Sequence, residues 1–160
     1  MRKPLRLGGF DYSGCGMYFV TVCVQHMESR FGVVEDGQVA LNDAGLMVAS
    51  MWESNATRYT GIALDAFVVL PNHLHAILFL RTEPGASEAP VSLSRIVQAF
   101  KSMTTVAYIR GVQAGIHPAF DRVLWQRGFH DRMLRNHDAL EAARLYIEQN
   151  PARVIQTTTS

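Results

Sequence analysis

The chain has 160 residues, 48% of them hydrophobic and 18% charged, and its formal net charge is +1. These values are typical of one globular domain with its own core and exclude a disordered chain. The apolar runs are far shorter than the roughly 20 residues that span a bilayer, and no apolar signal core follows the basic start of the chain. We expect a cytoplasmic protein without membrane contact, with a lead-in over residues 1–16, one domain over 17–155 and a tail over 156–160.

Runs of β-branched and aromatic residues predict five strands in the first half of the chain. The two shortest flank a turn that contains glycine, which predicts a hairpin. The expected strands cover residues 17–25, 30–34, 38–41, 62–70 and 73–81.

Apolar residues at helical spacing predict three helices. The first follows a capping residue at Asn42 and runs to about Arg58, and the second runs from Ser92 to about Arg110. The third starts at Asp138, since a glutamate three residues later resembles a capping box, and ends before Pro151.

The predicted elements follow one another as strand, hairpin, helix, two strands, helix, a short extended piece over 123–130, and helix. This order has no internal repeat and no strict βαβ alternation. It predicts an α+β fold in which helices pack on an antiparallel-rich central sheet. The strand over 73–81 is too apolar for an edge and should lie in the interior of the sheet.

His73 and His75 interrupt an apolar run that extends from Ala66 to Leu80. Side chains two positions apart in a strand leave the same face, about 6.5–7 Å apart, so both imidazoles can bind one metal ion. Burying polar imidazole rings costs free energy unless they bind a partner such as a hydrogen-bonding group or a metal ion. A cupin-type oxygenase or isomerase also uses such a pair, but Phe79 and Leu80 stand where its glutamate is needed.

The last predicted helix offers a third ligand and a nucleophile. Tyr146 and Asn150 are four residues apart and therefore share a helix face. With His73 and His75, the Asn150 amide oxygen would form a neutral ligand set compatible with Mg²⁺ or Mn²⁺. Such a cation polarises a phosphodiester and favours the phenolate of a nearby tyrosine, whose free pKa is about 10. The Asn150 amide four positions after Tyr146 is the only local argument for choosing Tyr146 over Tyr108 as the nucleophile.

Four motifs between residues 17 and 151 resemble, in the expected order, the single-tyrosine HUH transposases of the insertion-sequence 200/605 type. They are Tyr18-Phe19-Val20-Thr21, Val69-Leu70-Pro71-Asn72-His73-Leu74-His75, Trp125-Gln126-Arg127 with Asp131-Arg132, and Tyr146-Ile147-Glu148-Gln149-Asn150-Pro151. The resemblance is greatest to the REP-associated tyrosine transposase branch. Insertion-sequence members usually have glutamine where Asn150 stands, and asparagine indicates the REP-associated branch.

This resemblance implies a ferredoxin-like or RRM-like α/β sandwich and a divalent metal ion. It implies that His73 and His75 are the HUH ligands, Asn150 the third ligand and Tyr146 the nucleophile. The implied reaction cleaves single-stranded or hairpin DNA through a 5′-phosphotyrosine link, and the free 3′-OH can then attack that link to transfer the strand. A non-catalytic DNA-hairpin-binding protein is the alternative, and a monomer and a homodimer are both compatible with the resemblance.

The distribution of charge favours an anionic partner for the second half of the chain. Residues 1–90 hold six Lys/Arg and nine Asp/Glu, a balance of −3, whereas residues 91–160 hold nine and five, a balance of +4. Thirteen of the 15 basic residues are arginine, which suits bidentate phosphate contacts, although a GC-rich genome would also enrich it. Trp125 and Phe129 could stack on bases. The candidate DNA-binding residues are Arg95, Lys101, Arg110, Arg127, Arg132 and Arg135.

Overall fold

Four strands form one antiparallel sheet in the order β4-β5-β1-β6 in the computed structural model, which describes residues 15–81 and 91–159. They are β1 (Cys15–Cys23), β4 (Ile62–Leu70), β5 (His73–Arg81) and β6 (His130–Met133). The strand with the histidines, β5, pairs with β4 on one side and with β1 on the other. Its interior position is confirmed.

A separate two-stranded hairpin consists of β2 (Gly32–Glu35) and β3 (Gln38–Leu41). Its two loop residues, Asp36 and Gly37, both have positive φ angles, of 50° and 81°. A two-residue turn in which both residues have positive φ has a backbone twist that matches the right-handed twist of the paired strands. The predicted hairpin is therefore confirmed at this position.

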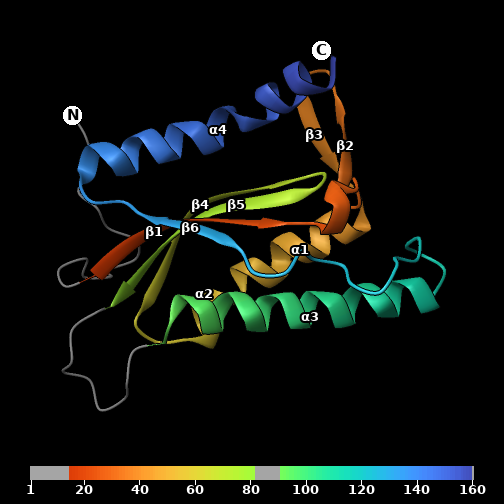
Figure 1. Cartoon of the computed structure of the whole chain (residues 1–160), viewed down its shortest axis with the longest axis horizontal. Coiled ribbons are helices and arrows are strands. Elements are labelled where there is room, and N and C mark those ends of the chain that lie inside the picture. The colour runs from red at the N-terminus through yellow and green to blue at the C-terminus, as the bar shows by residue number, and fades with distance from the viewer. Residues whose placement is uncertain (1–14, 82–90, 160) are drawn as a thin grey trace.

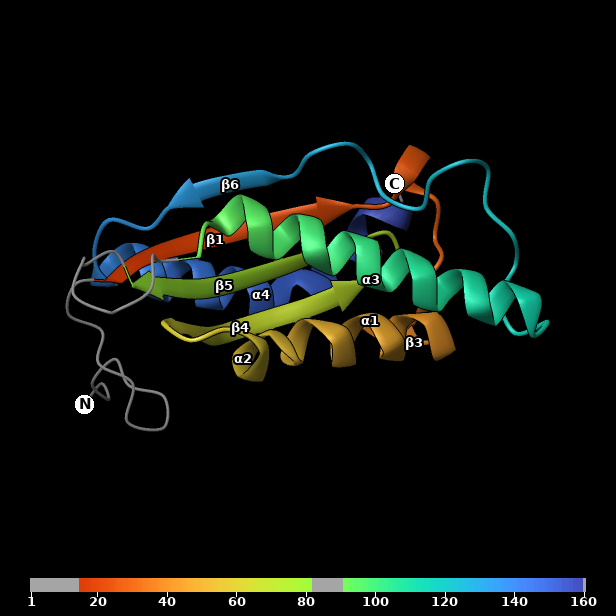
Figure 2. The ribbon, with the colours of Figure 1, turned by 90° about the horizontal axis from the view of Figure 1, so that it is seen from below.

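Helices cover both faces of the sheet. They are α1 (Asp43–Glu53), α2 (Asn55–Arg58), α3 (Leu93–Gln113) and α4 (His137–Thr159), and a short 3₁₀ helix, η1 (Gln25–Met27), follows β1. Figures 1 and 2 show α1 and α3 on one face and α4 alone on the other, which we call the α4 face. The α+β sandwich is confirmed. No helix within the described ranges is long and apolar enough to cross a membrane.

Alternate residues of β5 belong to two different cores. Leu74 and Ala76 join the core that also contains buried residues of α1 and α3. Ile77 joins the smaller core under α4. Because residues two apart in a strand share a face, His73 and His75 lie on the α4 face.

A bulge in β4 changes this alternation. The register passes from Leu64 opposite Leu78 to Phe67 opposite Ala76, so two residues of β4 stand opposite one residue of β5. Asp65 bonds to a residue of α4 and the next residue, Ala66, packs in the α4 core. Two consecutive side chains therefore occupy the α4 face.

The last helix differs from its prediction at both ends. Its cap is Asn136 rather than Asp138, because the Asn136 Oδ1 accepts a hydrogen bond from the backbone N–H three residues on, at 2.8 Å. It passes through Pro151 and continues to Thr159. Proline removes the one backbone hydrogen bond to the carbonyl of Ile147. Proline therefore did not end the helix.

One other helix boundary was predicted wrongly. The helix after Asn42 breaks at Ser54 before α2, where the Ser54 hydroxyl bonds the carbonyl of Met51 at 2.7 Å. The segment over 123–130, expected to be irregular or a short strand, is irregular apart from one isolated bridge, and β6 begins only at residue 130. All four β6 side chains are exposed, so no apolar alternation marks this strand. The loop expected over 82–90 lies outside the described residues.

Candidate metal and nucleophile site

His73 and His75 converge at the start of β5. Their Nε2 atoms are 3.1 Å apart, and the two ring planes are nearly perpendicular, at 80°. His75 is buried, with 7% of its surface exposed, and His73 is half-buried. We call these two residues the histidine pair.

The outer nitrogen of each ring has a partner. Asn72 donates its amide N–H to the carbonyl of Met27 at 3.3 Å, which turns its Oδ1 toward His73. That oxygen lies 2.6 Å from Nδ1 of His73, so Nδ1 carries the proton and Nε2 has a free lone pair. The Nδ1 of His75 lies 2.9 Å from the Thr21 hydroxyl, which can donate or accept. Such partners fix ring orientation in metal sites.

Both imidazoles are neutral at physiological pH. Burial lowers the pKa of His73. Burial also lowers the pKa of His75 to about 3, and the charges of His73 and Arg132 lower it further. Since a metal binds the unprotonated imidazole nitrogen, protons compete weakly for this pair.

The geometry of the histidine pair fits one divalent cation. When two nitrogens each bind an ion at about 2.1 Å, with an N–metal–N angle between a right angle and the tetrahedral angle, they are about 3.0–3.4 Å apart. The observed separation of 3.1 Å lies within this range. Within residues 15–81 and 91–150 no three His, Cys, Asp or Glu side chains gather as metal ligands.

Helix α4 carries Tyr146 to the histidine pair. The ring centroids of Tyr146 and His75 are 5.4 Å apart, edge to face, and Phe19 completes the aromatic cluster at 5.9 Å from Tyr146. Asn150 is buried one turn further on, and its Nδ2 donates to the Tyr146 carbonyl at 3.4 Å. This bond leaves the Asn150 oxygen for another partner.

Two kinds of contact seat α4 on the sheet. Leu140, Ala143 and Ile147 are buried in the core under the helix. Arg144 also forms two parallel hydrogen bonds, of 2.8 and 2.7 Å, with the carboxylate of Asp65 at the β4 bulge. These bonds raise the pKa of the Arg144 guanidinium against the opposing effect of its partial burial. The histidine pair and Tyr146 are thus brought together within one chain.

The sequence and the fold are similar to those of known proteins. No protein-family model matches the sequence. An uncharacterized protein of Haemophilus influenzae strain Rd is 30% identical, and the alignment covers 94% of this chain and 88% of the relative. The chain belongs to the same family as that protein.

Two solved structures share the fold of this family member. One is a REP-associated tyrosine transposase bound to a REP hairpin, with a TM-score of 0.57, 20% identity, and coverage of 96% of this chain and 74% of that chain. The other is a candidate transposase of Deinococcus radiodurans R1, with a TM-score of 0.54, 15% identity, and coverage of 93% and 98%. At these identities the likeness establishes the fold.

Among the candidate DNA-binding residues, Arg132 is the one for which the described part of the chain shows contacts with residues of the site. It pairs with Phe19 across β1 and β6, and its guanidinium lies 4.9 Å from the centre of the Phe19 ring. Its charge also acts on His75. The exposed Arg132 side chain therefore places a cation beside the histidine pair, on the α4 face.

The other predicted DNA-binding residues are not gathered at this site. Arg95 and Arg110 are exposed on α3, on the opposite face of the sheet, and Arg127 and Arg135 are exposed in loops. Lys101 donates to two backbone carbonyls, at 2.8 and 2.9 Å, and so holds the segment from residue 126 to 128.

The two candidate stacking residues face the core. Trp125 is 4% exposed, and its indole N–H donates to Thr104 at 2.8 Å. Phe129 is half-buried against the same core as Trp125. Both rings are therefore packed from at least one side within the protein.

Thr21 and Asn72 were missed as members of the site. Both stand inside motifs that were used for the resemblance, but a motif does not say which atoms meet. The role of Thr21 follows from strand pairing, since it is the direct partner of His75 in the β1–β5 ladder, whereas Asn72 lies in the turn just before β5.

Proposed function

We propose that this protein is a metal-dependent single-strand DNA endonuclease and strand transferase that acts on hairpin DNA. In this proposal Tyr146 is the nucleophile, and His73, His75 and Asn150 hold the metal ion. The observation that carries it is the convergence of two neutral imidazole nitrogens, 3.1 Å apart, beside the ring of Tyr146. The shared fold with a hairpin-bound REP-associated tyrosine transposase supports the choice of DNA as substrate.

The proposed reaction exchanges one ester for another. The Tyr146 oxygen attacks the phosphorus and releases its phenolic proton to solvent, while the bond from phosphorus to the 3′ oxygen breaks. The departing oxygen takes a proton and becomes the free 3′-OH of the upstream strand, and the downstream strand stays on Tyr146 through its 5′-phosphate. Attack of a 3′-OH on this link reverses the exchange and frees Tyr146, so no external energy is needed. Mg²⁺ or Mn²⁺ held by the histidine pair would supply Lewis-acid stabilisation of the phosphate charge.

The chain contributes positive charge through Arg132. Its exposed guanidinium, 4.9 Å from the Phe19 ring, can bind a phosphate oxygen of DNA lying on the α4 face. All three proposed ligands are neutral, so the charge of the cation is not cancelled by the protein. The site as a whole therefore suits an anionic phosphodiester.

The test is covalent capture of the DNA. Labelled hairpin oligonucleotides with single-stranded flanks are incubated with protein and Mg²⁺ or Mn²⁺, and adducts are separated on a denaturing gel. We expect wild type to form an adduct and Tyr146→Phe to form none while it retains hairpin binding. Tyr108→Phe is the matched control, because Tyr108 is a buried residue of α3 and its hydroxyl donates to the carbonyl of Pro118 at 2.8 Å.

An adduct that survives in Tyr146→Phe would refute the assignment of the nucleophile. A wild-type protein that binds hairpins tightly, yet forms no adduct with either metal, would instead favour a non-catalytic hairpin-binding protein.

A further inference from the structure

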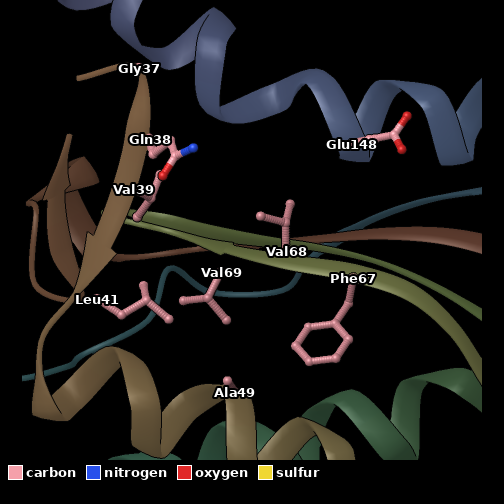
Figure 3. A pocket seen from close by; sticks show the side chains of 9 residues that line it. All are labelled: Gly37, Gln38, Val39, Leu41, Ala49, Phe67, Val68, Val69 and Glu148. Atoms are coloured by element: carbon pink, nitrogen blue, oxygen red, sulfur yellow. The ribbon is translucent and has the colours of Figure 1, made fainter. Parts of the chain in front are cut away.

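An apolar groove runs along the edge strand β4, between β3, α1 and α4 (Figure 3). Its volume is about 530 Å³, within the range of sites that bind small molecules. We call it the β3–β4 groove. The residues that matter for its chemistry are Gln38, Val39, Leu41, Phe67, Val68 and Glu148.

The groove is continuous with the proposed site. Val68 is the direct partner of His75 in the β4–β5 ladder and packs in the core that includes Tyr146. Directly paired residues of neighbouring strands are only about 5 Å apart. A group attached next to a phosphate at the histidine pair would therefore reach this groove.

The walls of the groove suit a flat apolar ring with a polar edge. Val39, Leu41, Phe67 and Val68 are only half-buried, so their apolar surface remains partly open to solvent. Val68 points toward α4, whereas Phe67 points toward α1, so the groove extends around the edge of β4. Figure 3 shows the Gln38 amide extending from β3 and Glu148 on the α4 side of the groove. An amide both donates and accepts hydrogen bonds, whereas a carboxylate only accepts.

We propose that the β3–β4 groove binds one unstacked base of the single-stranded DNA, next to the phosphate that reacts. This inference rests on the proposed function. The faces of the base contact the apolar walls, and its edge meets Gln38 and Glu148. Because a carboxylate accepts hydrogen bonds from exocyclic amino groups, Glu148 favours adenine, cytosine or guanine over thymine.

The size of the groove distinguishes a base from a protein partner. Stable protein interfaces bury at least about 1,000 Å², and a cavity of about 530 Å³ is too small to supply that area alone. The hairpin of β2 and β3 also covers part of the edge of β4, where a second chain would otherwise add a strand.

The test measures binding without cleavage, in the Tyr146→Phe background. Each flank nucleotide of a hairpin oligonucleotide is replaced in turn by an abasic site, and dissociation constants are measured by fluorescence anisotropy. We expect one flank position at which the abasic site weakens binding about tenfold, as loss of one stacked base does. At that position thymine should bind more weakly than cytosine.

Two variants assign this effect to the groove. Val39→Phe should fill the groove, weaken binding of intact DNA about tenfold, and abolish the abasic effect. Val33→Phe, the same change at an exposed position of the same hairpin outside the groove, should change neither. Glu148→Gln, at an exposed side chain that the fold tolerates, should remove the preference over thymine, whereas Glu53→Gln should keep it.

Two outcomes would overturn the inference. The first is a flat abasic profile, and the second is a Val39→Phe variant that changes self-association but leaves the abasic profile intact, which would assign the groove to a second copy of the chain. If wild type forms the Tyr146 adduct and the profile is flat, only the groove proposal fails. If no adduct forms but the profile shows the Val39-dependent position, the catalytic proposal fails and the groove proposal stands.

Discussion

The ion pair between Asp65 and Arg144, which joins β4 to α4, should make a large contribution to the free energy of unfolding. The Asp65 side chain is 5% exposed and that of Arg144 is 29% exposed, so the bond is mostly withdrawn from water. Arg144→Ala would leave a buried carboxylate whose bidentate partner is gone. Removing one member of a buried pair costs about 3–5 kcal/mol, and the partial exposure of Arg144 indicates the lower end, about 3 kcal/mol.

The prediction is checked by urea unfolding, followed by tryptophan fluorescence, of the two single variants and the double variant with Asp65→Ala. The double variant should lose less stability than the sum of the singles, with a coupling of about 2 kcal/mol. Arg58→Ala is the control, because this arginine is exposed and should change stability by less than about 0.5 kcal/mol. Additive single effects, or a loss below about 1 kcal/mol for Arg144→Ala, would refute the reasoning.

Two further predictions concern the histidine pair. Thr21→Val keeps the shape of the side chain but removes the hydroxyl from His75, and it should weaken Mn²⁺ binding about tenfold in calorimetry; an unchanged affinity would remove Thr21 from the site. Because burial holds the pKa of His75 at about 3 instead of 6.5, the unfolded chain binds one more proton than the folded chain between these values. The unfolding free energy of chelator-treated protein should therefore fall by about 2 kcal/mol from pH 7.5 to 5, and by less in His75→Leu. Urea titrations that give the same value at both pH would contradict this.

The sheet and most helices were predictable because local patterns determine them. Asn42 caps α1 by accepting the Gly45 N–H at 2.9 Å, and Ser92 caps α3 by accepting the Arg95 N–H at 3.1 Å, as expected from their positions. The alternation of β5 correctly placed both histidines on one face. These features depend on a few adjacent residues, which the sequence displays directly.

The parts that escaped prediction depend on contacts between distant residues. The bulge that brings Asp65 to α4 has no marker in the apolar run of β4. The exposed strand β6 has no apolar alternation, yet it carries Arg132 to the site through its pairing with Phe19. The position of Tyr146 beside His75 likewise depends on how α4 lies across the sheet. Its spacing from Asn150 gives the shared helix face but not the strand that this face meets.

Threonine at position 21 suits a pair of imidazoles that must bind and release a cation. Asn72 can only accept from His73, which keeps the Nε2 lone pair of His73 pointing inward in either case. In the tautomer of His75 that carries its proton on Nε2, that N–H donates a hydrogen bond to Nε2 of His73, while Nδ1 accepts one from the Thr21 hydroxyl. A cation bound at Nε2 would require the tautomer with its proton on Nδ1, and the same hydroxyl would then accept a hydrogen bond from Nδ1–H. A carboxylate at position 21 could only accept a hydrogen bond, so it would stabilise only the tautomer with the proton on Nδ1, and it would add a negative charge beside the phosphate. A neutral hydroxyl allows both tautomers of His75 and leaves the positive charge of the site uncancelled.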